Sequence, residues 1–115
     1  MHLKNFSLKE TEPANRNYYL SRAYDMLPVN IIMPEDEEQL ALTLNGKKKN
    51  IQRRDFLKFA ENCSIAEKSA NAMLNKLYSL KDEFLIQCDN SYLLDEYKIQ
   101  TKELIMQRAG IIAMQ

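Results

Sequence analysis

The chain has 115 residues, with 16 lysines and arginines balanced by 16 aspartates and glutamates. This length suits one domain, residues 1–115, and the balanced charge excludes a global attraction to nucleic acid or to anionic membranes. No apolar run approaches the roughly 18 residues of a membrane span, and the polar N-terminus does not resemble a secretory signal, so we expect a cytoplasmic protein.

Glycine and proline are scarce, with 2 and 3 copies, which favours a helical protein. The two cysteines, Cys63 and Cys88, are far apart in the sequence and fit no zinc-binding spacing. We interpret them as free thiols; a single disulfide is the less favoured alternative.

Two short strands are predicted near the N-terminus, at residues 5–8 (NFSL) and 18–21 (YYLS), separated by the polar loop KETEPANRN. As a hairpin they place Asn5 at the entrance and Asp25 just past the exit, close together in space. Two ligands of one metal ion must converge in this way. The following stretch, PVNIIMP, is expected to be extended, because proline disfavours helix in the residue before it.

The clearest local signal is a second hairpin. Leu40, Leu42 and Leu44 alternate with smaller residues, which predicts a strand with the three leucines on one face. Asn45-Gly46 is typical of a type I′ turn. The polar segment KKKNI then forms the return strand, on an exposed edge.

From residue 53 onward the pattern is helical. One helix is predicted over 53–62, and a second follows a capping box made by Ser64 and Glu67 and runs to about residue 87. A third is expected over 92–109, with Gly110 as its stop signal. The second helix should present one apolar face, formed by Ala66, Ala70, Met73, Leu77, Leu80 and Phe84.

A dense basic patch consists of Lys47, Lys48, Lys49, Arg53 and Arg54. One interpretation is a solvated edge strand and helix start. The other is contact with a phosphate backbone, which would weaken steeply with salt. No aromatic residue interleaves the patch, so stacking on single-stranded nucleic acid is not indicated.

The N-terminal residues contain part of a phosphoryl-transfer pattern. Protein-kinase catalytic loops have the form Asp-x-x-x-x-Asn, in which the aspartate accepts the substrate proton and the asparagine binds magnesium. Asn5 fits the asparagine if an aspartate stands directly before Met1, and Asp25 then fits the second metal ligand. Without such a context, Asn5 and Asp25 are turn residues, and His2 and Lys4 are flexible polar residues.

Three segments, HLKNFSL, AYDMLP and LALTLNGKKKN, together resemble the C-terminal part of HipA-like serine/threonine kinases, the toxin components of bacterial type II toxin–antitoxin pairs. The likeness covers the whole chain in order and is specific up to about Phe59. It implies an α+β, mainly α fold, similar to the helical C-terminal lobe of such a kinase, with two short β-hairpins packed against about three helices.

The resemblance also implies roles for individual residues. Asn5 and Asp25 would be ligands of Mg²⁺, with Asp25 bridging the ion to the phosphates of ATP. His2 and Lys4 would support the loop or contact phosphate. The proton-accepting aspartate and the ATP-gripping lobe would lie before Met1, so we expect either an internal methionine taken as a start or a truncated gene.

We therefore expect a fragment or truncated relative of a HipA-like kinase. The complete kinase would use Mg²⁺ and ATP to phosphorylate a protein serine or threonine and arrest growth, and this chain alone is predicted to be inactive. The alternative is a non-catalytic binding module that docks on a HipB-like helix-turn-helix antitoxin, on a kinase N-lobe or on another copy of itself. Operator DNA would be contacted only indirectly.

Overall fold

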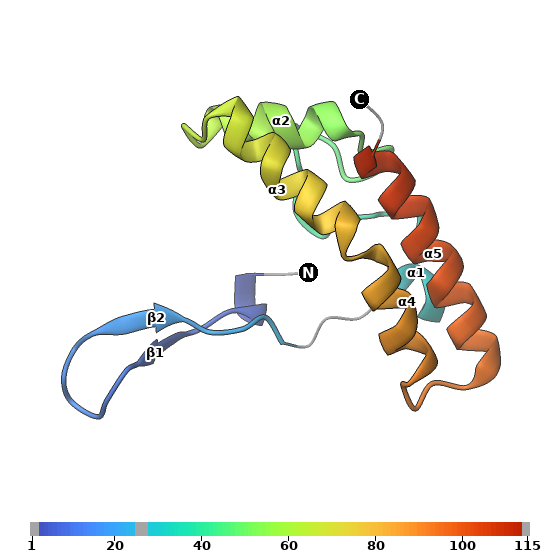
Figure 1. The fold of residues 1–115 in the computed structure, drawn as a ribbon, viewed down its shortest axis with the longest axis horizontal. Helices are drawn as coiled ribbons and strands as arrows, with labels where there is room; N and C mark the ends of the chain where they lie inside the picture. Colours follow the sequence, from blue (N-terminus) through green and yellow to red (C-terminus); the bar gives the residue numbers. More distant parts are fainter. Residues whose placement is uncertain (1–2, 25–27, 114–115) are drawn as a thin grey trace.

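The chain forms a short β-hairpin that stands beside a body of helices (Figure 1). The computed structural model describes residues 3–24 and 28–113. The α+β, mainly α fold expected from the sequence is confirmed. Within the described residues, no helix is both long enough and apolar enough to cross a lipid bilayer.

The predicted N-terminal hairpin is present, although its first strand begins later than expected. Residues Leu3–Asn5 form the 3-10 helix η1, so that the first strand, β1, spans Leu8–Glu10. It pairs with the antiparallel strand β2, Tyr18–Leu20. The register pairs Leu8 with Leu20, Lys9 with Tyr19, and Glu10 with Tyr18.

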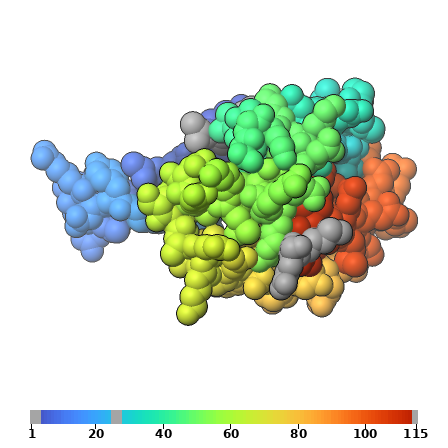
Figure 2. Space-filling view, turned by 90° about the horizontal axis from the view of Figure 1, so that it is seen from above, coloured from blue at the N-terminus to red at the C-terminus, as the bar shows by residue number. Residues whose placement is uncertain are grey.

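One face of this hairpin is exposed and mostly apolar. Because side chains alternate along a strand, Leu8, Tyr18 and Leu20 lie on the same face, together with the charged Glu10. We call the three apolar residues the hairpin apolar face. Their exposed fractions are 69%, 58% and 63%. No Cα atom of β1 or β2 lies within 8 Å of a described helix, and Figure 2 shows the hairpin projecting from the body. The described helices therefore leave this face uncovered.

The helical body is organised around its longest helix. That helix, α5 (Asp95–Ala113), contacts all four others: α1 (Val29–Ile32), α2 (Arg53–Asn62), α3 (Glu67–Ser79) and α4 (Lys81–Asp89). Small side chains at several contacts allow the helices to approach closely. The buried apolar residues are Ile31, Leu44, Ile51, Ala60, Ala70, Leu74, Cys88 and Ala109.

The second predicted hairpin is largely replaced by an irregular loop. Asn45 and Gly46 have positive φ angles of 50° and 73°, as the predicted turn requires. Only the bridge between Leu44 and Lys47 flanks that turn. The three leucines do not share one environment, since Leu44 is buried and Leu42 is 52% exposed. The prediction of a regular strand over 40–44 is therefore wrong.

The extended conformation predicted for residues 28–34 is also wrong, because α1 forms there. Pro28 stands at the N-cap of α1, where its fixed φ is compatible with a helix start. The restriction imposed by Pro34 acts only on Met33, which ends the helix with φ −128° and ψ 81°. Proline thus marks the end of α1 but does not prevent it.

The helix expected from Ser64 to about residue 87 is two helices, α3 and α4, separated at Leu80. Its expected capping box does not form, because Ser64 has a φ of 58° and the N-cap of α3 is Ala66. The expected apolar face is only partly covered. Ala70 is buried, whereas the exposed fractions of Met73, Leu77 and Phe84 are 58%, 48% and 44%.

The last helix begins later and ends later than predicted. The hydroxyl of Ser91 donates to the carbonyl of Cys88, 2.6 Å away, and helix α5 starts at Asp95. The helix continues through Gly110 to Ala113, so the prediction that Gly110 ends it is wrong. The predicted bounds of α2, 53–62, are confirmed.

The start of α2 contains a buried carboxylate, Asp55, with 1% of its surface exposed. It accepts hydrogen bonds from the Asn45 side chain (2.9 Å), from the Lys47 ammonium (2.9 Å) and from the Gln52 backbone N–H (2.9 Å). These donors, Asn45 first and then Lys47, lower the pKa of Asp55 from 3.8 to about 2. Together with Gln52 it forms a capping box that the sequence did not suggest to us.

Replacing Asp55 with Asn should destabilise the fold by about 1–3 kcal/mol at neutral pH, because Lys47 and Asn45 lose a charged acceptor. Since the folded pKa lies below the unfolded one, the charged carboxylate stabilises the fold above about pH 4. That contribution is lost as the pH falls through about 2. Urea unfolding between pH 7 and pH 2 should show a weaker acid dependence in Asp55→Asn. The control is Asp82→Asn, whose side chain is 79% exposed; equal acid dependence in both variants would contradict this assignment.

The exposure of the hairpin apolar face predicts unequal effects of leucine truncation. Leu74→Ala, at a buried position between helices, should cost about 2–5 kcal/mol of unfolding free energy. Leu8→Ala and Leu20→Ala should each cost less than about 0.5 kcal/mol, because neither side chain packs on the body. Chemical denaturation followed by circular dichroism measures the three values. A large loss in either hairpin variant would show that the face is covered in the isolated chain.

Candidate functional site

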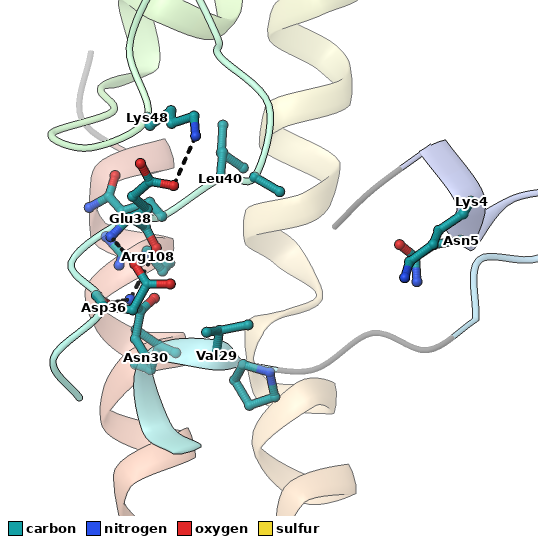
Figure 3. Close-up of a pocket in the computed structure, with 13 residues that line it drawn as sticks. Lys4, Asn5, Val29, Asn30, Asp36, Glu38, Leu40, Lys48 and Arg108 are labelled. Atoms are coloured by element: carbon teal, nitrogen blue, oxygen red, sulfur yellow. Dashed lines mark hydrogen bonds and ion pairs between the residues drawn. The ribbon is translucent and has the colours of Figure 1, made fainter. Parts of the chain in front are cut away.

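A cleft of about 520 Å³ lies between η1 and the helical body (Figure 3). Its lining comes from the N-terminal segment, the start of α1, the loop on both sides of the Asn-Gly turn, and α5. The lining residues are Lys4, Asn5, Pro28, Val29, Asn30, Asp36, Glu38, Gln39, Leu40, Ala41, Lys48, Leu104 and Arg108.

Asn5, a predicted metal ligand, is 97% buried, with an exposed fraction of 3%. Its side-chain amide donates to the backbone carbonyl of Tyr24 at 2.8 Å, and the backbone carbonyl of Asn5 accepts from the Tyr24 N–H at 3.1 Å. A carbonyl oxygen only accepts hydrogen bonds, so the amide atom that faces Tyr24 is Nδ2. The Oδ1 atom therefore lies on the opposite side of the amide.

The contact between Asn5 and Tyr24 extends the hairpin toward the cleft. The backbone N–H of Ser21 donates to the carbonyl of Ser7 at 2.7 Å, and the Ser7 and Tyr24 hydroxyls are 2.7 Å apart. The hairpin thus brings Asn5 to the residue that precedes Asp25 in the sequence. Asp25 itself, the second predicted ligand, lies outside the described residues, as does His2.

The body side of the cleft carries charged residues, and of these Lys48 was singled out from the sequence as part of the basic patch. The Asn30 amide donates to the backbone carbonyls of Asp36 and Glu38, which holds the acidic loop beside α1. Lys48 pairs with the Glu38 carboxylate at 3.0 Å. Arg108 reaches the same wall from α5; burial lowers the pKa of its guanidinium, although arginine stays protonated. Asn30 was not predicted as a site residue. From the sequence, residues 28–34 were expected to be extended, and an extended segment gave no reason to place the Asn30 amide against the acidic loop.

The cationic residues on the cleft lie on opposite sides of it. Lys4 is exposed and stands beside Asn5, whereas Lys48 and Arg108 belong to the body (Figure 3). Of the residues predicted to form the site, the cleft therefore brings together Lys4 and Asn5.

The five residues of the predicted basic patch do not form one surface. Lys47 pairs with the buried Asp55 at 2.9 Å. Lys48 pairs with Glu38 and Lys49 with Glu37, each at 3.0 Å. Arg53 is buried and Arg54 is exposed. The ion pairs reduce the positive charge that the three lysines offer to a phosphate backbone, and DNA contact through them stays a prediction.

The donor chemistry of Asn5 fits magnesium, which takes oxygen ligands such as amide carbonyls and carboxylates. The described residues, which leave out Asp25, contain no group of three or more histidine, cysteine, aspartate or glutamate side chains placed to hold a metal ion. A magnesium site here would therefore depend on Asn5, Asp25 and oxygens from a bound nucleotide.

Comparison with known proteins gives one family. Residues 1–84 match the model of the HipA-like C-terminal domain. No curated protein matches the chain significantly. The matched range contains the hairpin, the cleft loop, α2, α3 and the beginning of α4.

Proposed function

The chain belongs to the HipA-like C-terminal domain family, and from this premise we propose that it holds the magnesium ion and ATP phosphates of a HipA-like serine/threonine kinase. When bound, the metal neutralises the charge that develops during phosphoryl transfer to a protein hydroxyl. The observation that carries the proposal is the paired contact that fixes Asn5 against Tyr24, next in sequence to Asp25.

In this proposal Asn5 contributes a pre-oriented oxygen. Its amide is buried, and the hydrogen bond from Nδ2 to Tyr24 holds the side chain in one orientation. Binding a metal through Oδ1 then costs little conformational entropy, because the rotamer is already selected.

Asp25 supplies the negative charge in the proposal. Two oxygens from the protein bind Mg²⁺ only weakly, since this ion gives up its waters reluctantly and prefers phosphate as a further ligand. We therefore assign to the chain the binding of a metal–nucleotide complex. Lys4 and Arg108 on the cleft wall supply positive charge for the phosphates.

This proposal predicts where a paramagnetic metal binds. Titrating the ¹⁵N-labelled chain with Mn²⁺ and ATP should broaden the backbone amide signals of Asn5 and Tyr24 before those of α3 and α4. Asn5→Ala should weaken the effect by about tenfold or more, because one of two protein ligands is lost. Asp25→Asn should do the same.

The matched control is Asn62→Ala, which removes an exposed asparagine at the end of α2. The contact between Leu8 and Leu20 across the hairpin, followed in each variant, reports whether the hairpin is intact. The proposal would be contradicted if the broadening were centred on other residues. It would also be contradicted if Asn5→Ala and Asn62→Ala changed the broadening equally.

A second candidate function is docking, favoured by the exposure of the hairpin apolar face. Large uncovered apolar surfaces on a protein usually mark contacts with a partner. We propose that the occupant is the N-lobe of a HipA-like kinase, because the hairpin connects Asn5 to Tyr24 and its face therefore lies next to the candidate metal site. The lobe that binds ATP must contact the protein beside the metal site, because the ATP phosphates bind the metal ion.

Calorimetric titration with a purified HipA-like N-lobe tests this docking. The double variant Leu8→Lys/Leu20→Lys should weaken binding by at least about tenfold, since two apolar side chains would otherwise be buried. The control is Lys9→Gln/Tyr19→Thr, a cross-strand pair on the opposite face. Equal affinity of the two double variants would exclude this face. Self-association that only the leucine variant abolishes would identify a second copy as the occupant instead.

A further inference from the structure

A buried arginine in the body has no acidic partner among the described residues. Arg53 is 8% exposed. Its guanidinium donates to the carbonyl of Ile112 and to the side-chain oxygens of Asn71 (2.7 Å) and Asn75 (3.1 Å). These acceptors orient the guanidinium but are all neutral. Burying a charge is costly unless an opposite charge compensates it.

Arg53 lines a cavity of about 460 Å³ between α2 and α3. The neighbouring Arg54 lines the same cavity and is exposed. Among the described residues, no carboxylate forms an ion pair with Arg54. Two positively charged side chains therefore line the same cavity. Its remaining lining residues are Leu57, Glu67, Asn71 and Asn75.

The amide of Asn75 adds a hydrogen-bond donor to this wall. Its Oδ1 accepts from Arg53, so its Nδ2, in the same plane, points away from the Arg53 guanidinium. Asn71 is oriented in the same way, with Nδ2 donating to the backbone carbonyl of Glu67 at 3.1 Å. Both asparagines direct their oxygens to Arg53, and the Asn71 amide already donates to Glu67. This wall therefore offers an anion the Asn75 amide together with the charges of Arg53 and Arg54.

We propose that this cavity, bounded by Arg53, Arg54 and Asn75, is a binding site for a phosphate-type oxyanion. A carboxylate is planar and is satisfied by one guanidinium fork, whereas a tetrahedral oxyanion accepts from donors on both α2 and α3. The cavity, of about 460 Å³, also has room for a phosphate group carried on a larger molecule. The Glu67 carboxylate opposes binding and makes it weaker.

The site is separate from the magnesium-binding function proposed above. It involves none of the residues of the cleft that contains Asn5. Failure of either proposal therefore leaves the other unaffected.

Titration of the ¹⁵N-labelled chain with inorganic phosphate tests the site, with sodium chloride adjusted to keep the ionic strength constant. We expect saturable shifts in the signals of Arg54 and of the Asn75 side-chain amide, and much smaller shifts with acetate. Arg54→Gln should weaken binding by about fivefold or more, because one charged donor is lost. Glu67→Gln should strengthen it by about twofold, since a like charge is removed.

Arg22→Gln is the matched control, because Arg22 is an exposed arginine outside the cavity. Both arginine variants should keep the dispersed spectrum of the folded chain, since both side chains lie on the surface. Shifts that do not saturate, or that respond equally to Arg54→Gln and Arg22→Gln, would overturn the proposal and indicate only nonspecific ion association.

The source of the phosphate is distinguished by a second titration with a short DNA duplex. If the phosphate belongs to a nucleic-acid backbone, the duplex should shift the same signals, free phosphate should displace it, and the affinity should fall steeply with salt. If the ligand is a small phosphorylated molecule, inorganic phosphate should shift the signals of Arg54 and Asn75 while the duplex leaves them unchanged.

Discussion

The helical body depends on two buried charged side chains in the first turn of α2. Arg53 donates to α3 through Asn71 and Asn75 and to the end of α5 through the carbonyl of Ile112. Asp55 accepts from the Asn-Gly turn and from the backbone at Gln52. One helical turn therefore connects α3, α5 and the loop that precedes α2. The partners of Arg53 lie 18 to 59 positions away in the sequence, whereas those of Asp55 lie within 10.

The cleft follows from this arrangement. Asp55 fixes the Asn-Gly turn through Asn45 and Lys47. The loop on either side of this turn therefore lies against α5. There Glu38 pairs with Lys48, and Arg108 lines the same wall. The hairpin is attached differently, since its strands approach no described helix. Asn5 is therefore positioned by local hydrogen bonds to Tyr24, whereas the opposite wall is positioned by the body. A ligand in the cleft would contact both parts of the molecule.

The basic patch illustrates how a run of charges is divided by folding. Lysines at consecutive positions point to different acids, Asp55, Glu38 and Glu37, and Arg53 turns inward. From the sequence, a solvated edge strand and helix start is the favoured interpretation of these residues, and contact with a phosphate backbone is the alternative. Arg53 and Arg54 are separated from the three lysines and line a distinct cavity between α2 and α3.

Residue types and their spacing were enough to predict the family, the N-terminal hairpin, the turn at Asn45-Gly46 and the bounds of α2. These features depend on residue types at close spacing, such as alternation along a strand or the backbone freedom of glycine, so a local reading suffices. The sequence also placed Asn5 at the entrance of the hairpin, close to Asp25. The structure pairs Asn5 with Tyr24, and Asp25 lies outside the described residues.

Which polar residues are buried and which apolar residues stay exposed depends on how the helices and loops pack together. The pattern of the helix expected over 64–87 could not show the break at Leu80 or the exposure of Met73, because both depend on where α5 crosses α3 and α4. Likewise, Arg53 is buried because α3 and α5 supply its acceptors. Contacts between residues far apart in the chain determine this burial and exposure, and the spacing of residues within one segment does not reveal such contacts.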